Sequence, residues 1–201
     1  MSRAGSCRGR RVPHLSDAGY LYKPDLPVKL LSPRILIPVC AALAFTYHSN
    51  VNGHEAGDAA PNCALTSFTG GQRYDLQQFH GKVLYVDFWA SWCSPCARSF
   101  PFMNDLDREF RDRGLQIVAI NEDEKLEDAQ TFLAKYPANF TVVFDAGGQC
   151  ARKIGVKGMP STYLVDRQGV IRHVHLGFRP GAAEKLHGLV EQLLTNNPAG
   201  Q

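Results

Sequence analysis

Two cysteines separated by two residues, just after a strongly apolar segment, constrain this chain more than any other feature of its sequence. The apolar segment, Val83–Ala90, is nearly continuous, as expected for a strand buried on both faces of a sheet. The motif Cys93-Ser94-Pro95-Cys96 begins three residues later. Apolar residues then recur at spacings of three and four, which predicts an amphipathic helix over Pro95–Arg113 that Gly114 ends.

This junction of strand and helix favours thiol–disulfide chemistry. A spacing of three puts the sulfurs of Cys93 and Cys96 on one helical face, close enough to bond. Cys93 begins the helix, where unpaired N–H groups and the helix dipole stabilise a thiolate. Pro95 is tolerated in the first turn because no hydrogen bond is lost there. We interpret Cys93 as the attacking thiolate and Cys96 as the resolving thiol, against the alternatives of a metal half-site or two unrelated core cysteines.

The other potential ligands are scattered. Six cysteines in 201 residues are too few for a disulfide scaffold, and the second close pair of a zinc ribbon is missing. Cys63 and Cys150 are single cysteines, typical of small buried apolar residues, and a disulfide between them is left open. His173 and His175 alternate on one strand face without a third ligand, which is typical of a surface. We predict no metal and no cofactor beyond the redox-active cysteine pair.

The N-terminal segment differs in charge from the rest. Residues 1–34 hold seven Lys or Arg and two Asp or Glu, whereas the remainder holds 15 and 17. The folded part therefore has no basic stripe for nucleic acid. An uncharged apolar run follows two basic residues, which predicts a signal peptide or N-terminal anchor over residues 28–48. The run is short for a membrane span, and Pro38 interrupts it.

These features divide the chain. Residues 1–27 lack periodicity and are interpreted as a gene-model extension or disordered leader, with the true start at Val28. Residues 49–60 are predicted to be a linker, and residues 61–197 the folded domain. We expect that domain in the periplasm or on another extracytoplasmic face, exported or anchored, with membrane contact only through the N-terminal segment.

Strands and helices alternate through the folded part, which predicts an α/β sandwich with a mixed central sheet. Two short strands are expected around Gly70-Gly71, ahead of the buried strand and the helix already described. The later elements are expected to be, in order, the strand Leu115–Asn121, the helix Glu127–Tyr136, the strand Phe140–Phe144, the helix Gln149–Ile154, the hairpin Ser161–Asp166 and Val170–Leu176, and the helix Pro180–Leu194.

The motif and its surroundings resemble a known family. The stretch Val86–Cys96 resembles the active-site segment of thioredoxins, and Gly158–Thr162 resembles the loop that carries their cis-proline. Phe100-Pro101, Ile117–Asn121 and the inserted helix before Phe140 are similar to the exported TlpA/ResA-like subgroup. The resemblance covers the whole folded part and implies a thioredoxin-like three-layer sandwich with an inserted helix, acting as a thiol–disulfide oxidoreductase.

The same resemblance implies roles for residues outside the cysteine pair. Pro160 is expected to follow a cis peptide bond and to hold the Met159 backbone ready to pair with an extended substrate segment. Trp92, which precedes the motif, and Pro95, which lies between the two cysteines, are assigned to substrate binding. Asp87 lies among apolar neighbours and matches the buried acid of thioredoxins, whose raised pKa suits a general base; an outward-facing aspartate on an edge strand is the alternative.

An acidic segment, Glu122-Asp123-Glu124, follows the second long strand. TlpA/ResA-like proteins carry a functional glutamate at this strand end, and by counting from Asn121 the resemblance assigns that role to Glu124. Acidic clusters are more often solvated loops, which is the alternative. We expect Asp87 beneath Cys96 and Glu124 near the motif.

The resemblance also implies partners. They are exported disulfide-containing proteins, such as apocytochrome c or copper-site proteins, and a membrane thiol electron donor that keeps the pair reduced. The motif itself leaves the direction of electron flow open. The alternative is a metal-delivery or binding module on the same scaffold, which would need further ligands beside the cysteines. A peroxidase would need a threonine and an arginine near its cysteine, and the local pattern differs.

Overall fold

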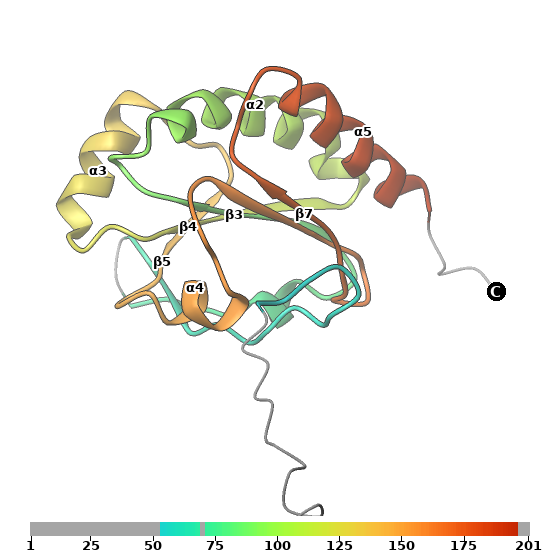
Figure 1. Ribbon diagram of the computed structural model, residues 1–201, viewed down its shortest axis with the longest axis horizontal. Coiled ribbons are helices and arrows are strands. Elements are labelled where there is room, and N and C mark those ends of the chain that lie inside the picture. Colours follow the sequence, from blue (N-terminus) through green and yellow to red (C-terminus); the bar gives the residue numbers. More distant parts are fainter. Residues whose placement is uncertain (1–52, 69–70, 197–201) are drawn as a thin grey trace, which may run out of the picture. The chain divides into compact units, whose positions relative to one another are not determined.

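A seven-stranded mixed sheet organises the part of the chain that the computed structural model describes, residues 53–68 and 71–196 (Figure 1). The strand order is β2-β1-β5-β4-β3-β6-β7. The strands are β1 Leu65–Ser67, β2 Arg73–Tyr74, β3 Val83–Trp89, β4 Leu115–Asn121, β5 Thr141–Phe144, β6 Ser161–Val165 and β7 Ile171–Leu176. The three inner strands β3, β4 and β5 are parallel and the others pair antiparallel, which confirms the expected mixed sheet.

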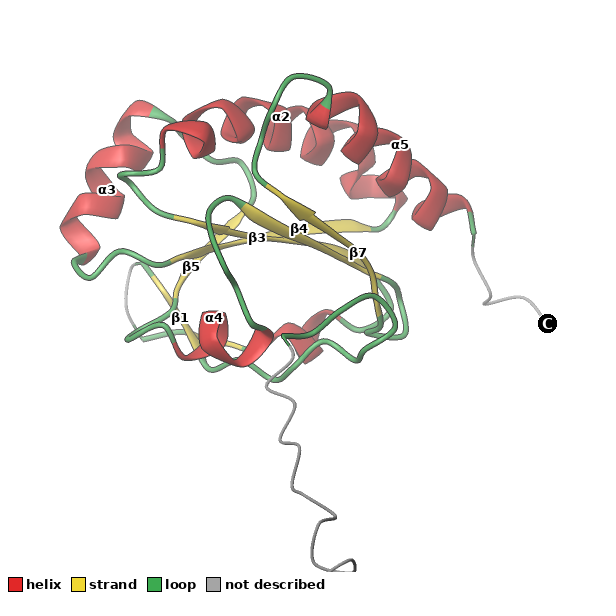
Figure 2. Cartoon of the chain, in the orientation of Figure 1, coloured by secondary structure: helices red, strands yellow, loops and turns green. Residues whose placement is uncertain are grey.

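Helices cover both faces of this sheet and complete three layers (Figure 2). The helices are α2 Ser94–Phe110, α3 Leu126–Lys135, α4 Gln149–Ile154 and α5 Ala182–Thr195, with the short 3₁₀ turns η1 Leu76–Phe79 and η2 Arg111–Arg113. α2, α3 and α5 lie on one face, and α4 lies on the other. α3 is the inserted helix. The helix predicted over Pro95–Arg113 consists of α2 and the 3₁₀ turn η2. Gly114 ends it, because its backbone takes the left-handed conformation (φ 98°).

Each face of the sheet has its own apolar core. The motif-side core lies under α2, α3 and α5 and includes Trp89, Phe100 and both motif cysteines. The α4-side core lies on the opposite face and includes Phe88, Cys63 and Cys150. All seven residues of β3 are buried, since its side chains alternate between the two cores. That alternation explains why the strand reads as a continuous apolar run.

The N-terminal boundary of the fold differs from the expectation. Residues 53–60, assigned to the linker 49–60, instead pack on the folded domain: the His54 N–H donates to the Ile154 carbonyl of α4, and residues 57–60 lie against the sheet edge. The Gly57 N–H donates to the Ile171 carbonyl, and the Ile171 N–H donates to the Asp58 carbonyl. An exposed strand edge leaves backbone groups without partners, and this segment satisfies part of β7. The predictions for residues 1–27 and 28–48 lie outside the described residues. Within the described ranges, no helix has the length and apolar character that a membrane crossing needs.

Candidate active site

The two motif cysteines form a disulfide at the start of α2. Cys93 is the N-cap residue, with an extended backbone (φ −86°, ψ 96°), and Cys96 lies in the first turn. Their Cα atoms are 5.3 Å apart and their sulfurs are bonded. The Cys96 N–H donates to the Cys93 sulfur over 3.3 Å. The helix start therefore directs an N–H group at the sulfur that would carry the thiolate charge.

Both cysteines of the pair are buried, although Trp92 and Ser94 on either side of Cys93 are exposed. Cys93 is 3% exposed and Cys96 0%, whereas the neighbouring Trp92 is 70% exposed. Pro95 occupies the first turn of α2 and is half-buried. Trp92 is one of few large apolar side chains on the surface, so it presents an apolar surface beside the disulfide.

The loop before β6 lies beside the same core. The Met159–Pro160 peptide bond is cis, which confirms the expected cis bond. The Ser161 hydroxyl donates to the Gly158 carbonyl over 2.6 Å, and the Gly177 N–H donates to the Pro160 carbonyl over 2.7 Å. Met159 packs against the motif-side core, which includes both cysteines. The fold thus brings the predicted substrate-binding loop and the disulfide to one core.

Asp87 is fully buried in the middle of β3. Its side chain faces the motif-side core, because Tyr85 and Trp89, two residues away on either side, both belong to that core. Burial raises the pKa of Asp87 to about 7, and a 2.7 Å hydrogen bond from the Thr162 hydroxyl opposes the rise. A carboxyl that titrates near neutrality can both accept and return a proton.

The acidic segment after β4 is arranged differently from the expectation for Glu124. Glu124 is exposed and makes no hydrogen bond or ion pair with the rest of the described chain. Asp123 is buried, and its carboxylate accepts from the Ser91 N–H over 2.9 Å and the Ser91 hydroxyl over 2.9 Å. The Asn121 amide also donates to it over 2.8 Å. Asp123 therefore fixes the turn that leads into Cys93.

Glu122, which the sequence reasoning passed over, is the perturbed acid of this segment. Burial, and next the neighbouring Asp145, raise the pKa of Glu122 to about 9, while Arg152 opposes the rise. One of its carboxyl oxygens is buried without a hydrogen-bond partner in the described structure. The signal was position: Glu122 directly follows the last residue of β4, so strand alternation carries its side chain inward toward α4.

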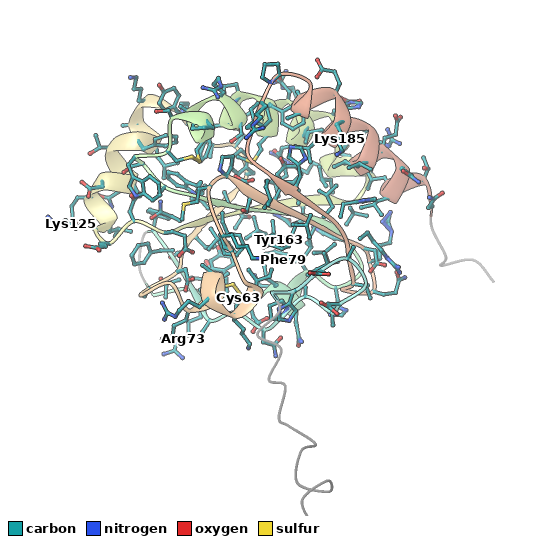
Figure 3. All side chains as sticks on the ribbon, in the orientation of Figure 1. Cys63, Arg73, Phe79, Lys125, Tyr163 and Lys185 are labelled. Atoms are coloured by element: carbon teal, nitrogen blue, oxygen red, sulfur yellow. A yellow bond between two sulfur atoms is a disulfide. The ribbon has the colours of Figure 1, made fainter. Side chains whose placement is uncertain are left out.

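A second disulfide joins Cys63 and Cys150 across the α4-side core; Figure 3 labels Cys63 beside α4. Both residues are 2% exposed. The bond ties the segment before β1 to α4 over a sequence separation of 87 residues. The sequence had left this pairing open, because it depends on how the two segments meet in space.

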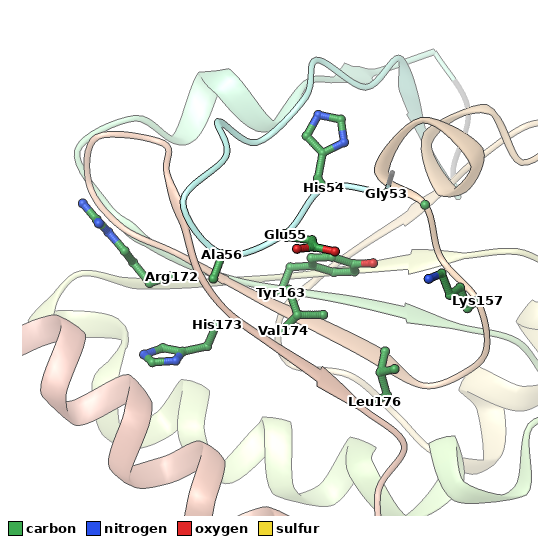
Figure 4. A pocket seen from close by; sticks show the side chains of 11 residues that line it. Gly53, His54, Glu55, Ala56, Lys157, Tyr163, Arg172, His173, Val174 and Leu176 are labelled. Carbon is green, nitrogen blue, oxygen red and sulfur yellow. The ribbon is translucent and has the colours of Figure 1, made fainter. Parts of the chain in front are cut away.

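A cavity of about 510 Å³ lies between residues 53–56 and strands β6 and β7 (Figure 4). No residue of the Cys93–Cys96 motif lines it. His54, Lys157, Tyr163 and Leu176 are among its lining residues, and none of the predicted site residues lines it. Within residues 53–68 and 71–196, no three His, Cys, Asp or Glu side chains are grouped so that they could hold a metal ion.

The fold and the paired cysteines define a thiol–disulfide oxidoreductase with a thioredoxin-like fold. Residues 55–193 match the Redoxin family, and the chain belongs to that family of the thioredoxin superfamily. The ResA thiol–disulfide oxidoreductase of Bacillus thuringiensis subsp. konkukian is 33% identical over 141 residues, which cover 68% of this chain and 81% of that protein. ResA of Bacillus subtilis is 34% identical over 147 residues, which cover 71% and 82%.

Solved structures of similar fold are also thiol–disulfide proteins. A thiol:disulfide interchange protein DsbE from Chlorobium tepidum is 47% identical, with a TM-score of 0.67, and the match covers 70% of this chain and 99% of that one. A protein disulfide isomerase from Bacteroides thetaiotaomicron is 25% identical, with a TM-score of 0.64, and the match covers 70% and 91%. The resemblance to TlpA/ResA-like oxidoreductases is thereby confirmed.

Proposed function

We propose that this protein is an extracytoplasmic protein disulfide reductase that acts on exported proteins. The observation that carries the proposal is the Cys93–Cys96 disulfide at the start of α2, packed in one core with the cis-proline loop. Relatives named ResA thiol–disulfide oxidoreductase and thiol:disulfide interchange protein DsbE support the exchange activity. The reductive direction and the substrates, such as apocytochrome c or copper-site proteins, are those that the resemblance to the TlpA/ResA-like subgroup implies.

The reaction transfers two electrons from the dithiol form to the substrate. The Cys93 thiolate attacks one sulfur of the substrate disulfide, and the other substrate sulfur leaves as a thiolate. Cys96 then loses its proton and attacks the Cys93 sulfur, which releases the second substrate thiolate and forms the Cys93–Cys96 disulfide. Asp87 accepts the Cys96 proton and returns it when a membrane dithiol donor reduces the disulfide again. Trp92 and the Met159 backbone hold an extended substrate segment across the pair.

The second disulfide supports the extracytoplasmic location. Disulfides that staple a fold persist in oxidising compartments and are rare where thiols are kept reduced. The Cys63–Cys150 bond is buried in an apolar core, as a staple would be. Residues 28–48 supply the export signal or anchor.

Glu124 contributes to the electrostatics of the motif from its exposed loop, more weakly than the buried Asp87 does because solvent screens its charge.

The test is reduction of insulin by the dithiol form, with turnover supported by a small dithiol. We expect activity in the wild type and none in Cys93→Ser. A reporter fused after Gly57 should be active outside the cytoplasm. A wild type that reduces no disulfide, or a reporter active only in the cytoplasm, would overturn the corresponding half of the proposal. Metal content measured on the same preparation addresses the alternative of a metal-delivery module.

A further inference from the structure

A short chain of buried polar groups crosses the sheet beneath the motif-side core. Asp87 and Thr162 are directly opposed in the antiparallel pair of β3 and β6. The Thr162 hydroxyl donates to one Asp87 carboxyl oxygen over 2.7 Å, and the Tyr85 hydroxyl lies 3.4 Å from the same Thr162 oxygen. All three side chains are buried. A hydroxyl has a single proton, so the one that Thr162 gives to the carboxylate leaves its oxygen to accept from Tyr85.

Thr162 is the hydrogen-bond partner on which the Asp87 carboxyl depends. The second Asp87 oxygen is buried without any partner among the described residues. A buried ionised carboxyl without hydrogen bonds is costly, so its remaining bond has a large effect on which protonation state is stable. A hydrogen bond given to the charged form favours that form.

The other groups that face this region do not replace Thr162. Tyr85 stays neutral, because burial raises its pKa well above the ordinary value. His175 on β7 is directly opposed to Thr162, and burial, followed by the charge of Lys185 on α5, lowers the pKa of His175. The cysteines of α2 face the same core as a disulfide. None of these groups hydrogen-bonds to Asp87 in the described structure.

Thr162 also stands close in sequence to the substrate-binding loop. It is the second residue of β6, and Pro160 with its cis peptide bond immediately precedes that strand. The Ser161 hydroxyl closes the loop on Gly158. One rigid strand start thus holds both the loop proposed to bind substrate and the side chain that bonds the buried acid.

We propose that Thr162 is a positioning residue for disulfide exchange, whose hydroxyl orients the Asp87 carboxyl and holds it in the ionised form that accepts the Cys96 proton. This inference rests on the proposed function and assigns it a residue to which the family resemblance gave no role. Without the hydroxyl, the carboxyl keeps its proton to higher pH, and fewer molecules at neutral pH can take up the proton that resolution releases.

The first measurement is independent of activity. The Asp87 carboxyl is followed by carbon-13 NMR through a pH titration of the full chain. Thr162→Val removes the hydroxyl at constant shape and should raise the Asp87 midpoint by about one pH unit. Thr162→Ser keeps the hydroxyl and should restore the wild-type midpoint. Thr131→Val is the matched control, because the Thr131 hydroxyl bonds the Glu127 carbonyl on exposed α3. It should leave the midpoint unchanged.

The second measurement is the resolution step. A mixed disulfide is preformed on Cys93 with a coloured aromatic thiol, and its release by Cys96 is timed. At pH 7, an Asp87 midpoint raised from about 7 by about one unit lowers the ionised fraction, and the rate, about five-fold. The deficit should disappear well above the raised midpoint. Thr162→Ala serves as a second variant if valine perturbs folding.

The outcomes separate the two proposals. An Asp87 midpoint that stays within about 0.3 pH unit of the wild type in both the valine and alanine variants overturns the role of Thr162. A release rate that stays at the wild-type value although the Asp87 midpoint shifts overturns the link between Thr162 and the resolution step. A wild type that fails to reduce insulin overturns the proposed function instead, and the titration still tests whether Thr162 controls Asp87.

Discussion

The two disulfides lie in the cores on opposite faces of the same sheet, and their solvent exposure is nearly equal. Cys93 is 3% exposed, and Cys63 and Cys150 are each 2% exposed. Exposure therefore does not distinguish a reactive disulfide from a structural one in this protein. The difference lies in the local structure: Cys93 is the N-cap of the long helix α2, its sulfur accepts from the Cys96 N–H, and the exposed Trp92 precedes it, whereas Cys63 precedes β1 and Cys150 lies within the short helix α4.

Sequence separation is the second difference. The motif disulfide closes a loop over three positions, and the other joins residues 87 positions apart. Opening a short loop gives the chain little new freedom, so the motif pair can open and close while the fold stays intact. Opening the long loop releases much more entropy in the unfolded chain.

The largest expected effects come from replacing the cysteines of the motif disulfide. Cys93→Ser should reduce insulin reduction to background, because no thiolate remains to attack. Cys96→Ser should instead accumulate mixed disulfides with protein partners, since attack survives and resolution does not. Mass spectrometry of captured partners measures the second effect. Faster alkylation of Cys96 than of Cys93 at mildly acidic pH would reverse the assignment.

Selective reduction sharpens the same comparison. In a chain with Cys7 and Cys40 replaced by serine, a mild dithiol under native conditions should expose two alkylatable thiols, those of Cys93 and Cys96. Four should appear only after unfolding, because the packing of α4 against the segment before β1 holds Cys63 and Cys150 together. Four labelled thiols in the native protein would remove the distinction between the two disulfides.

The next effect is on stability. Replacing both Cys63 and Cys150 by alanine should lower the free energy of unfolding by about 4–5 kcal/mol, from the loop-entropy relation for a long loop. The matched control, Cys93→Ala with Cys96→Ala, should cost about 2 kcal/mol by the same relation. Urea unfolding of the oxidised proteins measures both. Equal losses would show that loop length does not govern the difference.

Asp87→Asn should change how stability depends on pH. The pKa of Asp87 is raised from 3.8 to about 7 in the folded protein, so folding favours its protonated form. That stability is present below about pH 4 and is lost as pH rises through 7. Asp87→Asn has no titrating group at this position, so its free energy of unfolding should rise by about 2–4 kcal/mol relative to that of the wild type between pH 4 and pH 8. Urea midpoints at both pH values measure the gain, and an unchanged difference would count against a buried acid.

The smallest expected effects compare two glutamates of one segment. The pKa of Glu122 is raised from 4.5 to about 9, so it stays protonated in the folded protein at neutral pH, and the stability that this gives is lost progressively as pH rises from about 4.5 to 9. Glu122→Gln should remove that loss, which is roughly 1 kcal/mol after allowance for solvent screening. Glu124→Gln should shift the alkylation profile of Cys93 by less than about 0.3 pH unit. If Glu124→Gln shifts the alkylation profile of Cys93 more than Glu122→Gln does, the functional role belongs to the exposed Glu124.

The sequence by itself determined the features that local pattern encodes. The buried strand β3, the helix after Cys93 and the strand Leu115–Asn121 follow from apolar periodicity, since a strand buried on two faces and an amphipathic helix have different repeats. The cis bond before Pro160 followed from the resemblance to thioredoxins. Thiol–disulfide chemistry followed from the spacing of two cysteines at a helix start, which is local information as well.

Only the tertiary structure decided the features that depend on segments distant in sequence. The Cys63–Cys150 bond forms because α4 packs against the segment before β1. Thr162 meets Asp87 because β3 and β6 pair in one particular register, 75 residues apart. The raised pKa of Glu122 depends on its burial and on the approach of Asp145, which follows β5. Such contacts are set by the packing of whole elements, and spacing along one chain does not encode them.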